Sequence, residues 1–138
     1  MQSDFLDAHH RHWGDAELLF QQNRLANADH LYGVAAECGL KRLMLAFGMV
    51  YDSAKDRPAD SRDAEHVKKI WSRFENYRSG HPAGPNYILP PENPFADWHV
   101  GQRYAPRSNF DNRRVGDHKA GASQVRALVH QALRDGLI

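Results

Sequence analysis

Arginine is concentrated near the end of the chain, in a stretch that could bind an anion. Four arginines lie there with a single acidic residue, Asp111, among them: Arg103, Arg107, Arg113 and Arg114. The net charge is only +1, but six Lys/Arg and nine Asp/Glu give residues 1–60 a charge of −3, while 12 and eight give residues 61–138 a charge of +4. Overall charge therefore predicts no general affinity for nucleic acid, whereas a local group of guanidiniums can hold a phosphate. The alternative is an arginine-rich loop in solvent.

Three histidines near the N-terminus, His9, His10 and His12, invite a second interpretation, as metal ligands. His9 and His12 share one face of a helix at i,i+3 spacing. A metal site needs a third and usually a fourth ligand from another helix, and no HExxH spacing or cysteine pair accompanies these histidines. We expect packed, hydrogen-bonded histidines, and we assign no metal and no cofactor.

Glu37 and Lys41 form a possible ion pair at i,i+4 spacing on the most apolar segment of the chain. Cys38 lies beside them on an apolar face and is predicted to pack rather than to react. As the only cysteine, it excludes an internal disulfide and is typical of a reducing, cytoplasmic compartment. No apolar run approaches the roughly 18–20 residues of a membrane span, so we expect no membrane contact.

Helices must position these side chains, because apolar residues recur at helical spacing in four segments. The predicted helices cover about residues 4–22, 28–51, 61–79 and 117–135. The second is apolar around most of its circumference, which is typical of a central helix. Gly80 is predicted as a left-handed cap of the third helix, and Gly136 closes the last.

The segment between the third and fourth predicted helices, residues 81–116, holds six of the seven prolines. Proline at this density forbids a continuous helix, yet the segment also carries too many apolar side chains for a disordered linker. We expect an ordered loop folded back over the helices. The length of 138 residues suits a single domain, residues 1–138. The predicted fold is all-α, an up-and-down four-helix bundle with a long proline-rich loop before its last helix.

Residues 36–41, Ala-Glu-Cys-Gly-Leu-Lys, resemble the A-E-x-x-L-K run in the second helix of HEPN domains. Residues 97–106 are similar to the R-Y-P segment that often precedes the last helix of that family, with Ala105 inserted between Arg103-Tyr104 and Pro106. The resemblance implies a HEPN-like bundle that forms a homodimer.

Some HEPN domains are metal-independent endoribonucleases of toxin or defence type that use an R-x(4–6)-H motif. Arg113 and His118 match R-x4-H just before the last predicted helix. An imidazole can take the 2′-hydroxyl proton or protonate the leaving oxygen, and a guanidinium can hold the phosphate. The resemblance therefore implies a catalytic Arg113 and His118, oriented by Glu37. The alternative is that Asp117 caps the last helix and His118 is an ordinary residue of its first turn.

Other HEPN domains are not catalytic and bind nucleotides or accompany a nucleotidyltransferase. For this alternative the resemblance implies phosphate or nucleotide binding by a basic and aromatic set: Arg103, Tyr104, Arg107, Arg114 and Lys41. The expected partners are then RNA or a nucleotide, a nucleotidyltransferase or an antitoxin. A third hypothesis, favoured by the near-neutral charge, is a helical interaction protein unrelated to nucleic acids. Whether the chain is an enzyme stays open at this point.

Overall fold

Four α-helices account for most of the chain in the computed structural model, which describes residues 1–138. They are α1 (Phe5–Gln21), α2 (Leu25–Ala46), α3 (Val67–Ser79) and α4 (Asn112–Arg134). The only strands are β1 (Tyr51–Asp52) and β2 (Arg57–Pro58), which pair antiparallel. The all-α prediction is therefore confirmed. None of the four helices combines the length and the apolar character needed to cross a membrane.

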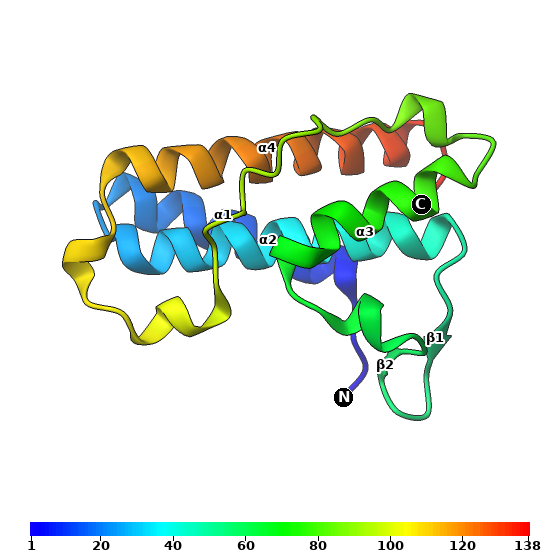
Figure 1. Cartoon of the computed structure of the whole chain (residues 1–138), viewed down its shortest axis with the longest axis horizontal. Helices are drawn as coiled ribbons and strands as arrows, with labels where there is room; N and C mark the ends of the chain where they lie inside the picture. The colour runs from blue at the N-terminus through cyan, green and yellow to red at the C-terminus, as the bar shows by residue number, and fades with distance from the viewer.

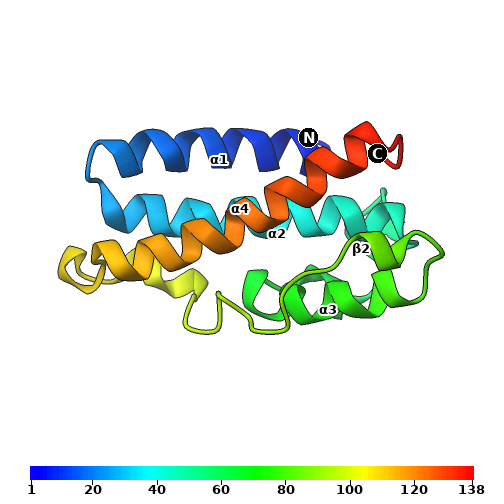
Figure 2. The ribbon, with the colours of Figure 1, turned by 90° about the horizontal axis from the view of Figure 1, so that it is seen from above.

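Helix α2 is the common partner of the other three helices. Figure 2 shows α1 along one side of α2, α3 on the opposite side, and α4 crossing α2 obliquely. The side chains of Tyr32, Leu40, Leu43 and Met44 are completely buried on α2. This burial explains why the helix is apolar around so much of its circumference.

The ends of two helices differ from the predicted ends, and at the start of α4 the cause is a capping side chain. Helix α2 begins at Leu25 rather than near residue 28, and it stops at Ala46 because the chain turns at Gly48, whose φ is +105°. Helix α4 begins at Asn112, five residues before the predicted start, since the carboxylate of Asp111 caps it by accepting from the Arg114 N–H at 2.8 Å. Asp117 is therefore inside the helix and not its cap.

The third predicted helix is divided in the structure. Ser61–Ala64 form a separate 3₁₀ turn, η1, and α3 starts only at Val67. Gly80 follows α3 with a φ of −87°, so the left-handed cap predicted there is absent. Gly136 does have a positive φ, +69°, at the end of α4.

The proline-rich segment runs from His81 to Asp111 and contains three 3₁₀ turns, η2 (Gly84–Asn86), η3 (Val100–Tyr104) and η4 (Arg107–Asn109). In Figure 1 it leaves the end of α3, passes α4 and turns back to meet the start of α4.

Four aromatic side chains of this segment join the hydrophobic core: Tyr87, Phe95, Trp98 and Phe110. Two of them lie against glycines, Trp98 on Gly33 of α2 and Phe95 on Gly121 of α4. The proline-rich segment thus packs onto α2 and α4 at glycine positions, where no side chain blocks the contact.

Adding one methyl group at Gly33 tests this contact. A Cβ atom there would lie 2.2 Å from the Cε2 and Nε1 atoms of Trp98, so the indole must move. We expect Gly33→Ala to lower the free energy of unfolding by about 1–3 kcal/mol, measured by urea denaturation. Gly14→Ala on α1 is the matched control, because nothing lies within 4 Å of its added Cβ. That change should be neutral or should stabilise by up to about 1 kcal/mol. Equal effects of the two substitutions would contradict the packing described here.

Candidate functional site

His118 lies between two carboxylates in the interior of the protein. Its side chain is 1% exposed on α4. The Nδ1 atom lies 2.6 Å from Asp29 Oδ1 on α2, and Nε2 lies 2.9 Å from Asp97 Oδ1 in the proline-rich segment. A neutral imidazole offers only one N–H donor, whereas two ionised carboxylates require two. The geometry therefore indicates a doubly protonated, cationic His118.

Arg114, one helical turn before His118, completes the surroundings of these carboxylates. Its Nη1 donates to Asp97 Oδ2 at 2.7 Å and its Nη2 to the Asp97 carbonyl at 2.9 Å. Gln102 joins from η3, where its Nε2 donates to Asp29 Oδ2 at 2.6 Å and its Oε1 accepts from Arg114 Nη2 at 3.1 Å. We call these five residues, Asp29, Asp97, Gln102, Arg114 and His118, the His118 network. It contains two cations and two anions.

Mutual charge favours the ionised forms of His118 and Asp97. Burial by itself would lower the pKa of His118, but the hydrogen bonds and charges of Asp29 and Asp97 raise it above its ordinary value of 6.5. Burial would raise the pKa of Asp97, but His118 and Arg114 lower it on balance. The stabilisation from His118 is thus complete below about pH 6.5 and is lost as the pH rises through its raised pKa.

The structure does not bring the predicted catalytic residues together. His118 is buried with both ring nitrogens engaged, so no lone pair is free to accept a proton from a ligand. Arg113 is exposed and forms no hydrogen bond or ion pair within the chain. Glu37 lies outside the His118 network, bonded to Lys41 and His66.

Glu37, Lys41 and His66 form a separate charged group that ties α2 to the start of α3. Lys41 Nζ lies 2.8 Å from one carboxylate oxygen of Glu37, and His66 Nδ1 lies 3.1 Å from the other. The bond to Glu37 raises the pKa of His66, although burial opposes this change. Since the Lys41 side chain is only 6% exposed and already paired, it is not available to bind phosphate as the sequence had suggested.

The N-terminal histidines are packing residues in the structure. His9 is fully buried, and its Nδ1 lies 2.8 Å from the carbonyl oxygen of Ala35, to which it donates. Burial lowers the pKa of His9 to about 4. The rings of His10 and His130 lie 6.0 Å apart. No group of three or more His, Cys, Asp or Glu side chains is arranged to hold a metal ion.

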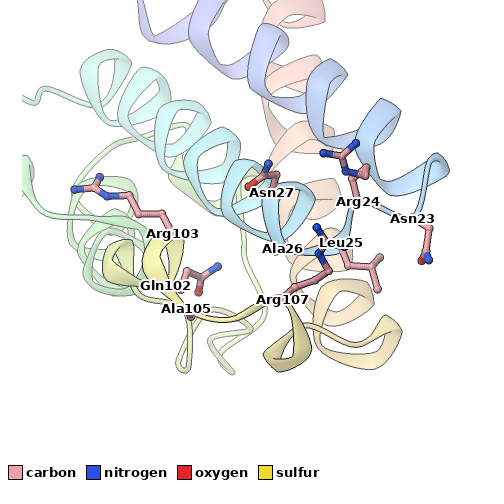
Figure 3. A pocket seen from close by; sticks show the side chains of 9 residues that line it. All are labelled: Asn23, Arg24, Leu25, Ala26, Asn27, Gln102, Arg103, Ala105 and Arg107. Carbon is pink, nitrogen blue, oxygen red and sulfur yellow. The ribbon is translucent and has the colours of Figure 1, made fainter.

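A hollow of about 200 Å³ opens between the start of α2 and the segment that carries η3 and η4. Nine residues line it: Asn23, Arg24, Leu25, Ala26, Asn27, Gln102, Arg103, Ala105 and Arg107. We call it the arginine hollow, because three arginines and no acidic residue contribute to it. Figure 3 shows Arg24, Arg107 and Asn27 gathered around the first turn of α2, with Arg103 at the far end.

Unpaired donors face this hollow from the backbone as well as from side chains. The N–H groups of Leu25, Ala26 and Asn27 have no acceptor in the chain, since the first bond of α2 runs from the Ala28 N–H to the Arg24 carbonyl at 3.1 Å. No side chain caps this end of the helix. The partial positive charge of a helix N-terminus thus adds to that of the arginines. The arrangement suits an anion such as a phosphate group.

None of the three arginines has a carboxylate partner, so their charges are uncompensated. Arg24 and Arg107 form no ion pair, and the Arg103 guanidinium lies 5.0 Å from the ring centroid of Tyr104. The Tyr104 side chain is 80% exposed. Of the residues expected to bind phosphate, Arg103 and Arg107 line the same hollow, Tyr104 lies against Arg103 outside its lining, and Arg114 belongs to the His118 network.

Sequence analysis missed several of the residues that build these two sites. Arg24 fell outside the predicted second helix, so its place at the first turn was not evident. Asp29 had a readable signal, because it shares the apolar stripe of Tyr32 and Ala36 at helical spacing and an acid in such a stripe must be paired. Asp97 and Gln102 carry no local pattern that marks them.

Comparison of the chain with protein-family models, with curated proteins and with solved structures found no match.

Removing Asp29 tests the importance of the buried charges. Asp29→Ala leaves the Nδ1–H of the His118 imidazolium and the amide of Gln102 without an acceptor, so we expect the free energy of unfolding near neutral pH to fall by about 3–5 kcal/mol in urea denaturation. Asp117→Ala on α4 is the control, since Asp117 is exposed and forms no ion pair. Its effect should stay within about 0.5 kcal/mol. A loss at Asp29 no larger than this would show that the His118 network is not charged as described.

Proposed function

We propose that this chain is a HEPN-like helical module that binds RNA or a nucleotide by its phosphate in the arginine hollow and does not cleave it through Arg113 and His118. The observation that carries the proposal is the pair of arginines without carboxylate partners, Arg24 and Arg107, beside the uncapped first turn of α2, with Arg103 farther along the same hollow. Such a site offers charge-assisted and backbone donors to one phosphate from two sides.

The HEPN-like assignment is supported by the order of the elements and the place of the motif residues. Glu37 and Lys41 lie on the central helix α2, and residues 97–106 precede α4. That segment supplies Arg103 and Tyr104, which correspond to the R-Y part of the family pattern. We propose an up-and-down arrangement of the four helices, with the proline-rich segment as the family's connection to the last helix.

Non-catalytic binding is favoured over RNA cleavage by the state of His118. A general base needs a free lone pair within reach of the ligand, and here both nitrogens are bonded to carboxylates of the same chain. The arginine hollow, in contrast, is open to solvent.

Tyr104 extends the proposal from a phosphate to a nucleotide. Among the large hydrophobic residues, Tyr104 has the most exposed aromatic side chain, and its ring lies next to Arg103. A nucleobase attached to the bound phosphate can stack on this ring, as bases do on exposed aromatic side chains of proteins that bind single strands.

Neutralising one arginine of the hollow tests phosphate binding. We expect Arg107→Gln to weaken binding of a short, fluorescently labelled single-stranded RNA by about tenfold in fluorescence anisotropy, because one hydrogen bond between charged groups is lost. Arg24→Gln should have a similar effect. Arg113→Gln is the matched control: it removes the same charge from an exposed position outside the hollow and should leave the affinity nearly unchanged.

Two outcomes would contradict the proposal. Equal weakening by Arg113→Gln and Arg107→Gln would show that RNA senses only the overall charge. Cleavage of the same RNA in the presence of a chelator, if lost in Arg113→Ala, would restore the catalytic alternative.

Replacing Tyr104 separates nucleotide binding from binding of a simple anion. Tyr104→Ala should weaken RNA binding by about tenfold, since loss of base stacking costs about 1–3 kcal/mol per base. Tyr104→Phe keeps the ring and should bind nearly as tightly as wild type. Neither substitution should change the binding of inorganic phosphate, measured by calorimetry. If both leave RNA affinity unchanged, the base does not contact Tyr104.

A further inference from the structure

Gln102 connects the buried His118 network to the surface of the arginine hollow. Its side chain bonds to Asp29 and Arg114 on one side, while the residue itself lines the hollow and precedes Arg103. The same side-chain oxygen also accepts a hydrogen bond from the backbone N–H of His99, at 3.2 Å. His99 is the residue that caps the start of η3. The position of η3, and with it Arg103, therefore depends on the bonds of one glutamine to the buried charges.

The number of protons on His118 decides whether all bonds of the network can exist together. With two protons, the ring donates to Asp29 and to Asp97. With one proton, a nitrogen lone pair must face a carboxylate oxygen, and that contact is repulsive. The bond to Asp97 is the one that opens, because the Asp97 side chain is 63% exposed and can turn toward water, whereas Asp29 is fully buried.

Asp97 lies three residues before η3, so its release removes one attachment of the segment that carries Arg103, while the Trp98 indole stays bonded to the Asp29 carbonyl. Arg114 stays bonded to Asp97, but both of its bonds end on Asp97 itself, within the same short segment. The groups that face His118 come from every packed element: Asp29 from α2, Asp97 from the proline-rich segment and Arg114 from α4. Phe95 covers one face of the imidazole, with ring planes 16° apart and centroids 5.3 Å apart.

We infer that His118 is a positioning residue of the arginine hollow: its two N–H groups fix Asp97 and Asp29, these fix η3, and loss of one proton from the ring weakens anion binding in the hollow. The inference takes its ligand from the proposed function, but its proton chemistry stands on the bonds of His118 alone. His118 does not touch the ligand.

The direction of the pH dependence follows from the charges. Burial lowers the pKa of His118, but Asp29 and Asp97 raise it on balance, so the doubly protonated form persists to higher pH than in a free imidazole and is lost as the pH rises further. Arg24, Arg103 and Arg107 keep their charge throughout this range, and so do the phosphodiesters of RNA. A fall in affinity with rising pH is thus not explained by titration of the arginines or of the RNA backbone.

Asp97→Asn separates the role of the proton from the role of the contact. The side-chain amide that this substitution introduces can donate from Nδ2 to a singly protonated His118 and accept from Arg114 at Oδ1, so every bond survives with a neutral ring. Asp117→Asn removes the same charge from an exposed position of α4 whose side chain forms no hydrogen bond or ion pair, and it serves as the matched control.

The experiment measures RNA affinity by anisotropy between about pH 6 and pH 9, together with the NMR titration of the His118 ring nitrogens and of the backbone amides of residues 97–104. For wild type and Asp117→Asn we expect the affinity to fall by about tenfold as His118 titrates. The amide signals should follow the same pKa. For Asp97→Asn we expect a nearly constant affinity above neutral pH.

Three results would overturn the inference: a singly protonated His118 at neutral pH, amide signals of residues 97–104 that ignore its titration, or an identical pH dependence in wild type and Asp97→Asn. If no variant binds RNA at any pH, the proposed function fails on its own. The NMR titration of the free protein then decides the inference, because it reports the position of η3 without a ligand.

Discussion

Burying the charge of His118 is the constraint on which the rest of the structure depends. An imidazolium that is 1% exposed is costly unless anions compensate it, and the chain supplies two carboxylates from distant segments. Asp29 is fixed on the central helix, so the ring of His118 fixes the register of α4 against α2. Asp97 is fixed in turn, which seats the proline-rich segment over both helices. One ionised ring thereby joins α2, α4 and the proline-rich segment.

The same constraint divides the arginine-rich stretch into different tasks. The Arg114 guanidinium is bonded to Asp97 and Gln102. Arg113, its neighbour in sequence, is exposed to solvent. Arg103 and Arg107 remain without carboxylates and line the arginine hollow together with Arg24. A stretch that looks uniform in the sequence thus contains one structural residue, one surface residue and two residues of the hollow. The difference arises from which side chains reach the buried acids.

How much could be predicted from the sequence depends on the range of the interaction. Helical periodicity is local, so the four helices and the central role of α2 were readable. Capping is also local, but its signal in the sequence is weak. Because Asp111 caps α4, the helix begins five residues before its predicted start, and no pattern in the apolar residues indicates this. Pairing of charges is not local at all. His118 could be selected for its type and spacing, but its engagement by Asp29 joins residues 89 positions apart, and no sequence pattern in one chain reveals such a partner.

The distance along the chain between Asp29 and its partners also has a consequence for biosynthesis. The Trp98 indole bonds to the Asp29 backbone across 69 residues, and His118 to its carboxylate across 89. While the chain is being made, α1 and α2 are complete long before either partner leaves the ribosome. During that interval an acidic side chain and an apolar helix face are left without cover, and contacts at such separation form slowly. The nascent first half is therefore the form of this protein most exposed to aggregation and to capture by chaperones.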